Sequence, residues 1–317
     1  MPAPSGQAEV AAFLRDRAGA EPLETHISLV FVGADTVWKL KKAVRLTFLD
    51  FTSLAARRRF TLRELELNRP AAPGLYRDAV PVVRQADGRL AFGEPGDAAA
   101  IDWVLRMARV PQGDFLDEIA AAGKLTPRLL DALGDTVAAF HGRLPPVRGT
   151  AIAAAMRDVA RGNARSAHEA GLPENAVREW QARILAALDA LTPWLAGRER
   201  DGFVRRAHGD LHLGNLCLWE GRPVPFDALE FDEAMATIDL GYDLAFLLMD
   251  LDQRVSRAAA NRVLNRYVAR TGDAALTRGL PVFLSLRAMI RAHVEAKRGH
   301  AAVAASYLTA ASGYLRP

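Results

Sequence analysis

The eight residues HGDLHLGN, from His208 to Asn215, constrain the fold of this chain more than any other stretch. Two histidines, a carboxylate and a carboxamide lie between two β-like runs, VRRAHGD and NLCLWEGRPVPFD. One interpretation is a metal site, with His208, Asp210 and His212 on one face of a strand. A second is a tight turn whose Asp and Asn side chains hydrogen-bond their own backbone. No further His or Asp group lies nearby at the spacing that a two-metal site needs.

A third interpretation is a phosphoryl-transfer loop. Protein kinases use H-R-D-L-x-x-x-N, in which the Asp accepts the proton of the substrate hydroxyl and the Asn holds magnesium. His208, Asp210, Leu211 and Asn215 keep this spacing, with Gly209 in place of the arginine. The pattern predicts that Asp210 is the catalytic base.

A magnesium-binding Asp should then follow after one hairpin. Asp227 stands seventeen residues after Asp210, at the end of the apolar run PVPF and past a turn at Glu220-Gly221. Magnesium prefers hard oxygen ligands from one or two protein groups and from phosphates. We therefore expect Asn215 and Asp227 to be the magnesium ligands.

The same chemistry needs a strand lysine for the phosphates and a helix glutamate to hold it. Lys39 lies in the alternating run TVWKL, and the next predicted helix carries Glu64 and Glu66. The two glutamates are about 200° apart around a helix, so at most one can face Lys39. Apolar periodicity does not decide between them.

Taken together, HGDLHLGN, PFDALEF and GYDLAFLL resemble the aminoglycoside phosphotransferase family, which shares the protein-kinase-like fold and includes choline kinase relatives. The resemblance covers most of the chain. It implies that Asp210 is the base, that Asn215 and Asp227 bind magnesium, and that Asp243 supports the catalytic loop.

Three further stretches, VWKLKKAV, ELELNRP and LAFLLMDLD, are similar to a poorly characterised subgroup of that family. Its members are often joined to a C-terminal P-loop kinase-like domain, which the resemblance implies as a fused domain or a partner. The pattern G-x-x-x-x-G-K-[ST] is absent from this chain. The likeness favours Glu64 over Glu66 as the partner of Lys39.

The chain departs from this pattern around the nucleotide. It has no G-x-G-x-x-G, so we expect the covering turn to be ETHIS (24–28), with Thr25 and Ser28 hydrogen-bonding phosphate. RMARVP (106–111) is expected to be the hinge that meets adenine, through Met107 and Val110. DALE keeps the metal-binding Asp of the family but not its neighbours.

Periodicity and capping residues predict an α+β chain with a small sheet lobe followed by a larger helical lobe. The resemblance implies that this arrangement is the two-lobe, protein-kinase-like fold. Residues 1–108 would form a small lobe that covers the nucleotide, with a β-sheet, hairpins turning at GAD (33–35) and Asp87-Gly88, and one key helix from Ser53 to Asn68. Residues 109–317 would form a larger, mainly helical lobe that holds the catalytic loop and metal site. Its first long helix would begin at Thr126-Pro127.

Composition and charge limit the classes of function that this chain can have. The net charge of +4, from 41 basic and 37 acidic residues, is too mild to indicate nucleic-acid binding. No apolar run approaches a membrane span, no signal peptide is visible, and the single Cys217 allows no intrachain disulfide, so we expect a cytoplasmic protein. Three of the five lysines cluster at Lys39, Lys41 and Lys42, which hints that a compact charge is needed there.

These observations predict an ATP- and Mg²⁺-dependent phosphotransferase, a kinase acting on a small-molecule hydroxyl. Only eleven residues lie between Asp227 and Asp239, too few for a regulatory loop and a peptide-docking segment. The segment from Arg148 to Arg206 contains ten arginines and seven carboxylates, a charge balance that gives no support to a polycationic antibiotic as substrate. The alternatives are a nucleotide-binding regulatory module without phosphotransfer and an AMP transferase on the same fold.

Overall fold

The computed structural model describes residues 5–46 and 49–316, which pack into two compact units. Unit 1 comprises Met1–Asp114 and Cys217–Asp232, and unit 2 comprises Phe115–Leu216 and Glu233–Pro317. The sequence had suggested one boundary between residues 108 and 109. The structure divides the chain differently, because the segment 217–232 returns to unit 1, where Lys39 and Lys41 bind its carboxylates.

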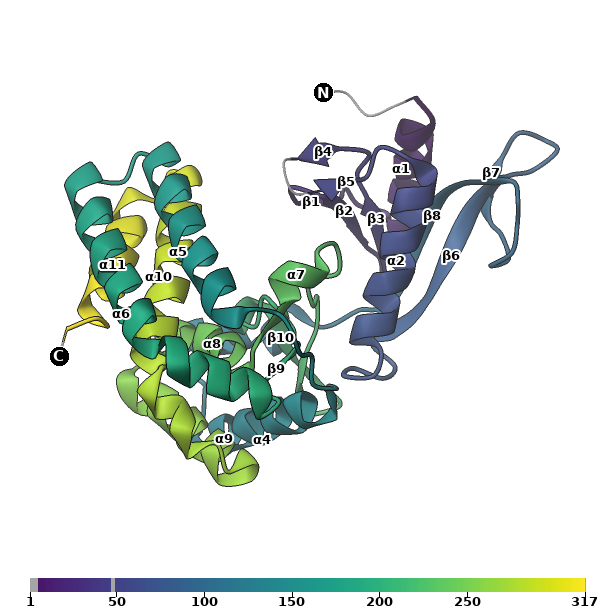
Figure 1. Ribbon diagram of the computed structural model, residues 1–317. Coiled ribbons are helices and arrows are strands. Elements are labelled where there is room, and N and C mark those ends of the chain that lie inside the picture. The colour runs from purple at the N-terminus through teal and green to yellow at the C-terminus, as the bar shows by residue number, and fades with distance from the viewer. Residues whose placement is uncertain (1–4, 47–48, 317) are drawn as a thin grey trace. The chain divides into compact units, whose positions relative to one another are not determined.

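Unit 1 contains an antiparallel sheet whose described strands pair in the order β1-β2-β3-β8-β6-β7 (Figure 1). The predicted hairpins are confirmed: β2 pairs with β3, and β6 pairs with β7. A short pair, β4 and β5, and the hairpin of β10 and β11 complete the strands. Their bounds are β1 Leu23–Glu24, β2 Ser28–Val32, β3 Thr36–Lys41, β4 Arg45–Leu46, β5 Leu49–Asp50, β6 Tyr76–Arg84, β7 Leu90–Phe92, β8 Ala100–Ala108, β10 Leu216–Trp219 and β11 Arg222–Pro225.

The two faces of this sheet carry different chemistry. Side chains alternate along a strand, so Leu40 of β3 points opposite to its neighbours Lys39 and Lys41. Leu40 packs in an apolar core with Val10 and Leu14 of helix α1 (Ser5–Ala18). Both lysines instead reach helix α2 (Leu54–Asn68). One face is thus an apolar core, and the other is a charged layer.

Helix α2 begins and ends as its sequence predicts. The Ser53 hydroxyl accepts a hydrogen bond from the Ala56 N–H at 3.1 Å, which satisfies one of the unpaired donors of the first turn. The helix ends at Asn68, just before Pro70. Its buried face is polar, and comprises Arg57, Thr61, Glu64 and Asn68.

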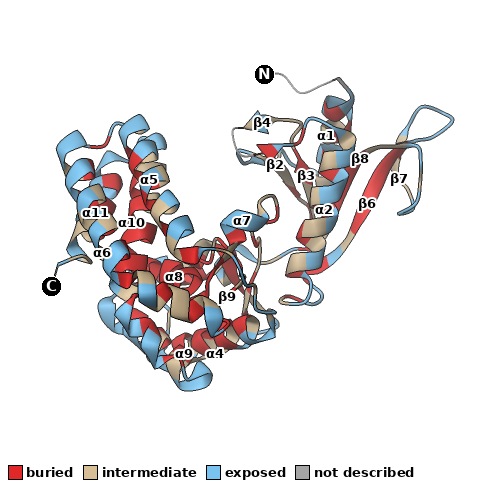
Figure 2. Cartoon of the chain, in the orientation of Figure 1, coloured by how far each residue is buried: buried red, intermediate tan, exposed pale blue. Residues whose placement is uncertain are grey.

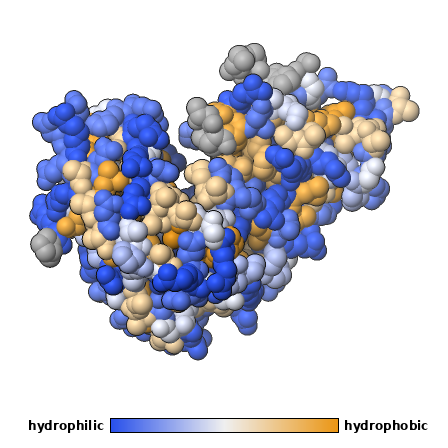
Figure 3. All heavy atoms as spheres, in the orientation of Figure 1, coloured by the Kyte–Doolittle hydropathy of each residue, from blue (hydrophilic) through white to orange (hydrophobic). Residues whose placement is uncertain are grey.

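Unit 2 is mainly helical. Helix α8 is buried along residues 240–251 and contacts both α9 and α10 (Figure 2). The outer surface over α5 and α6 is largely hydrophilic (Figure 3). The helices are α3 Leu116–Ala121, α4 Pro127–Arg143, α5 Ile152–Glu169, α6 Glu174–Arg200, α7 Glu233–Ala236, α8 Leu240–Arg254, α9 Arg257–Thr271, α10 Leu280–Lys297 and α11 Ala301–Gly313. Strands β9 (Val204–Arg206) and β12 (Thr237–Asp239) pair antiparallel.

The first long helix of unit 2 also begins as predicted. Thr126 accepts a hydrogen bond from the Leu129 N–H at 3.2 Å, and Pro127 occupies the first turn of α4, where its missing N–H costs nothing. Within the described ranges, 5–46 and 49–316, we find no helix with the length and apolar character that crossing a bilayer requires.

Candidate active site

Lys39 lies in β3 and forms two ion pairs within unit 1. Its Nζ lies 2.7 Å from Oε1 of Glu64 and 2.5 Å from Oδ1 of Asp227. Burial alone would lower the pKa of Lys39, but the carboxylates of Asp227 and Glu64 raise it well above its usual value. The side chain is therefore an ammonium at neutral pH, the form that attracts phosphate.

Helix α2 directs Glu64 to the sheet and Glu66 to solvent. Glu64 is 1 % exposed, and its two carboxylate oxygens accept hydrogen bonds from Lys39 and Lys41, each at 2.7 Å. Burial would raise the pKa of Glu64, but the two lysines lower it to about 2. Glu66 is exposed and pairs with Arg63. The ion pair with Lys39 is thus made by Glu64, the residue that the resemblance favoured.

Asp227 follows strand β11, and unit 1 holds its backbone from two sides. Its N–H donates to the hydroxyl of Tyr76 at 2.9 Å, and the next N–H, of Ala228, donates to Oδ1 of Asn68 at 2.8 Å. Asp227 has a φ of +60°, which L-residues adopt rarely and only where the surroundings enforce it. Its side chain remains 42 % exposed. The backbone of Asp227 is therefore fixed, while its carboxylate is open to a ligand.

The segment 24–28 forms a turn, but its hydroxyl groups are already engaged or buried. Thr25 Oγ1 donates to the Ser28 carbonyl oxygen at 3.1 Å and accepts from the Ser28 N–H at 2.9 Å. The Ser28 side chain is 0 % exposed. The prediction that the Ser28 hydroxyl meets phosphate is not supported by this position, because strand alternation turns that side chain inward. Thr25 closes the turn in this structure.

The two residues expected to contact adenine lie at the end of β8. Met107 is partly buried, and its backbone lies between β3 and β6, opposite Val37 and Tyr76. Val110 follows the strand and is also partly buried. The contact of both residues with adenine stays a prediction.

In unit 2 the predicted catalytic loop, residues 208–215, is bound by Asp243 of α8. The carboxylate of Asp243 accepts hydrogen bonds from the N–H groups of His208 and Gly209, at 3.1 Å and 2.9 Å. Nε2 of His141 also lies 3.1 Å from this carboxylate, and Nδ1 of His141 lies 2.9 Å from the Tyr267 hydroxyl. Burial would raise the pKa of Asp243, but His141 lowers it below its usual value. A buried anion thus fixes the backbone just before Asp210.

Asp210 and Asn215 contact each other directly. Nδ2 of Asn215 donates to the carbonyl oxygen and to Oδ2 of Asp210, both at 2.9 Å. Nε2 of His212 lies 3.4 Å from the same Oδ2. Burial opposes ionisation of Asp210, but His212 and other nearby cations lower its pKa below the usual range. Asp210 is therefore an ionised acceptor whose side chain is 43 % exposed.

The side chains of His208, Asp210 and His212 do not together form a metal cluster. His208 is buried, and its Nδ1 accepts a hydrogen bond from the Asp210 N–H at 3.3 Å. In the part of the chain that the structure describes, no group of three or more His, Cys, Asp or Glu side chains is placed to hold a metal ion.

Arg287 of α10 contacts this loop, and the sequence did not predict that contact. It is 4 % exposed, and it donates to the Gly209 carbonyl oxygen at 3.3 Å and to the Tyr242 carbonyl oxygen at 3.1 Å. Its guanidinium group lies 3.8 Å from the centre of the Tyr242 ring. Gly209 stands at the position where protein kinases carry an arginine. In this chain Arg287, which lies far from Gly209 in the sequence, contacts that position. No local motif marks Arg287.

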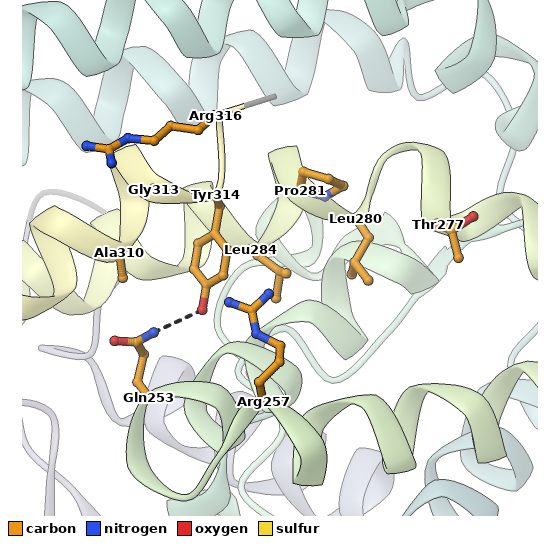
Figure 4. Close-up of a pocket in the computed structure, with 10 residues that line it drawn as sticks. All are labelled: Gln253, Arg257, Thr277, Leu280, Pro281, Leu284, Ala310, Gly313, Tyr314 and Arg316. Atoms are coloured by element: carbon orange, nitrogen blue, oxygen red, sulfur yellow. Dashed lines mark hydrogen bonds between the residues drawn. The ribbon is translucent and has the colours of Figure 1, made fainter.

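Unit 2 also contains a pocket that includes none of the predicted site residues. It has a volume of about 500 Å³ and lies among α8, α9, α10 and α11 (Figure 4). Arg257 and Tyr314 line it, and both bond Asp252. Its polar groups are therefore largely engaged with one another.

Comparisons with known proteins show relatives in sequence and in fold. An uncharacterized protein of Mycobacterium tuberculosis is 28 % identical over 281 residues, which is 87 % of this chain and 54 % of that protein. The chain therefore spans about half the length of the curated relatives it matches.

The fold is shared by a number of solved structures, two of which are compared with this chain. One is a thermostable mutant of aminoglycoside phosphotransferase APH(4)-Ia in ternary complex with ADP and hygromycin B, with a TM-score of 0.55, 14 % identity, and coverage of 97 % of this chain and 98 % of that one. The other is choline kinase from Cryptosporidium parvum, with a TM-score of 0.54, 10 % identity, and coverage of 98 % and 94 %.

The family model described as "Phosphotransferase enzyme family" matches residues 33–279, a range that runs from before Lys39 to beyond Asp243. This match covers well over half of the chain. The chain therefore belongs to the phosphotransferase enzyme family.

Proposed function

We propose that this protein transfers the γ-phosphoryl group of ATP to a hydroxyl group of a small molecule, with the help of magnesium. The observation that carries the proposal is the state of Asp210, an ionised and partly exposed carboxylate on a loop that buried Asp243 fixes. Lys39, paired with buried Glu64, supplies the matching cation in unit 1. Phosphoryl transfer depends chiefly on such positioned charges.

Lys39 would steady the phosphates of ATP, and Glu64 would orient it. Lys39 also binds Asp227. Binding of ATP would therefore replace this ion pair, so that Lys39 turns to phosphate oxygens while Glu64 keeps its hold.

The residues present fit magnesium. Both hydrogen bonds of the Asn215 amide nitrogen go to Asp210, which leaves the amide oxygen as the atom able to coordinate a cation. Asp227 offers a partly exposed carboxylate. Two hard oxygen donors, completed by phosphate and water, are the set that magnesium takes in kinases. When bound, the ion would neutralise charge on the transferred group.

Asp210 would accept a hydrogen bond from the acceptor hydroxyl and finally take its proton. Its lowered pKa makes it a weak base, so orientation of the hydroxyl is its larger contribution. The acceptor is proposed to be a small molecule, as in the family. The chain between Asp227 and Asp239 is too short for a peptide-docking segment.

The proposal is tested by Asp210→Ala in an assay that incubates the protein with Mg²⁺, ATP and a metabolite pool, and follows ATP-dependent mass gains. Turnover should fall by about 10²–10⁴, the usual contribution of a general base. Binding of AMP-PNP should stay as in the wild type. Asp158→Ala is the matched control, because that carboxylate is exposed and pairs with Arg161 on the surface.

Near-normal phosphorylation by Asp210→Ala would refute the assigned base. A product that gains AMP instead of phosphate would identify an AMP transferase. Nucleotide binding without any product would favour a regulatory module. The P-loop kinase-like domain or partner implied by the subgroup stays a prediction.

A further inference from the structure

Strand β3 presents two lysines to one buried carboxylate. Lys39 and Lys41 are two residues apart and share a face of the sheet. Each bonds a different oxygen of Glu64, at 2.7 Å. The role of Lys39 follows from the proposed function, but that function gives no role to Lys41.

The two lysines differ in their second partner and in their exposure. Lys39 is 13 % exposed and binds the open carboxylate of Asp227. Lys41 is 2 % exposed, binds the buried carboxylate of Glu230, and lies 5.4 Å from the centre of the Phe51 ring. A ligand can thus reach the first ion pair, whereas the second is enclosed by protein.

Lys41 is charged despite its burial. Burial alone would lower the pKa of Lys41, but the carboxylates of Glu64 and Glu230 raise it. Buried charges at this depth are maintained only when each has partners. The ion pair of Lys41 with Glu230 therefore fixes the segment 227–230 to helix α2 through Glu64.

This second ion pair matters because the first one must open. When ATP binds, the ion pair between Lys39 and Asp227 would have to break. Lys39 would then bind phosphate, and Asp227 would bind the metal. Asp227 also has a strained backbone, so without a further attachment the segment would relax as its side-chain partner leaves. Among the attachments that remain are the hydrogen bonds to Tyr76 and Asn68 and the buried pair of Lys41 with Glu230.

We propose that Lys41 is a positioning residue: by holding Glu64 and Glu230 together, it keeps Asp227 in place for the metal when nucleotide displaces Lys39. The inference rests on the proposed function, since it assumes that Asp227 meets the metal and Lys39 the phosphates. It assigns a functional role to the paired lysines of β3, of which only Lys39 touches the nucleotide.

The test measures AMP-PNP binding by titration calorimetry, with Mg²⁺ and with EDTA. The ratio of the two affinities reports how well the metal is held. The variant Glu230→Gln keeps the Lys41–Glu64 pair but weakens the attachment of Lys41 to the segment 227–230. We therefore expect the Mg²⁺-dependent gain in affinity to fall at least tenfold. Affinity in EDTA should stay within about threefold of the wild type, since Lys39 is intact.

The double variant Lys41→Met/Glu230→Gln removes the pair without leaving a buried charge at residue 230, and should show the same loss. Lys39→Met should instead weaken binding in both conditions. Arg89→Met is the control: Arg89 also lies in unit 1, but it is exposed and pairs with exposed Asp87. It should change neither affinity.

Thermal unfolding of each variant shows that it is folded. A folded Glu230→Gln and a folded double variant that keep the full Mg²⁺-dependent gain would overturn the role of Lys41, while nucleotide binding by the wild type would leave the proposed function standing. A wild-type protein that binds no AMP-PNP in Mg²⁺ would overturn the proposed function itself, and the role of Lys41 with it.

Discussion

His293 in α10 is a partly buried ionisable side chain that takes no part in the candidate site. Its Nδ1 is buried, and no partner for it lies among the residues that the structure describes. Burial, together with nearby Lys297, lowers the pKa of His293 to about 4. The folded protein therefore holds this imidazole neutral where an unfolded chain would protonate it.

This shift predicts a loss of stability in mild acid. An unfolded histidine titrates near 6.5, so between about pH 6.5 and 4 the unfolded state binds more protons than the folded state. The free energy of unfolding then falls as the pH falls, by about 2 kcal/mol from this residue at pH 5. Urea unfolding at pH 7 and pH 5 should show a loss that is smaller by about this amount in His293→Leu. Equal losses in the two proteins would exclude His293 as the cause.

At the scale of elements, Arg198 joins three segments of unit 2. From helix α6 it binds Asp239, just before α8, at 2.6 Å and 2.9 Å. It binds Asp273, just after α9, at 2.8 Å and 2.9 Å. The guanidinium group is buried and lies 4.2 Å from the centre of the Phe203 ring.

Removal of Arg198 should therefore destabilise unit 2 strongly. Arg198→Met leaves two buried carboxylates without their cation, and we expect a loss of about 3–5 kcal/mol in the free energy of unfolding. Arg198→Lys should recover only part of it, because an ammonium cannot form two bidentate pairs. Urea unfolding at pH 7 measures both. Arg161→Met, which breaks an exposed pair with Asp158, should cost at most about 1 kcal/mol.

The elements themselves were largely predictable from the sequence, because their signals are local. Ser53 and Thr126 cap the helices that they were expected to cap, and Asp87-Gly88 turns a hairpin. The buried face of α2 was not predictable in this way, since it is polar and apolar periodicity cannot detect it.

The same distinction between local and long-range signals applies to the residues of the candidate site. The catalytic-loop motif identified Asp210 and Asn215, and these two residues do contact each other. Lys41 with Glu230 and Arg287 with Gly209 were missed, because each pair is separated by many residues and has no spacing to recognise. Ser28 was expected to meet phosphate because its hydroxyl belongs to the turn 24–28, but the burial of that side chain depends on the folded strand and cannot be read from the turn sequence.

At the scale of the whole molecule, unit 1 is discontinuous in the chain. Its first part ends at Asp114, and its second part, residues 217–232, follows about a hundred residues of unit 2. The second part is attached by Trp219, which donates to the Pro73 carbonyl oxygen at 3.0 Å, and by the ion pairs of Asp227 and Glu230.

The segment 1–114 should consequently not fold stably alone. Without residues 217–232, Lys39 would lose Asp227 and the buried ammonium group of Lys41 would lose Glu230. A buried charge that loses its partner costs about 3–5 kcal/mol. Joining 217–232 to 1–114 through a long Gly/Ser linker should restore cooperative unfolding, followed by circular dichroism in urea. The same fusion carrying Asp227→Asn and Glu230→Gln is the control, and should recover little of the stability. If the fragment 1–114 alone unfolded at the same urea concentration as the fusion, the ion pairs of this segment would not be what completes unit 1.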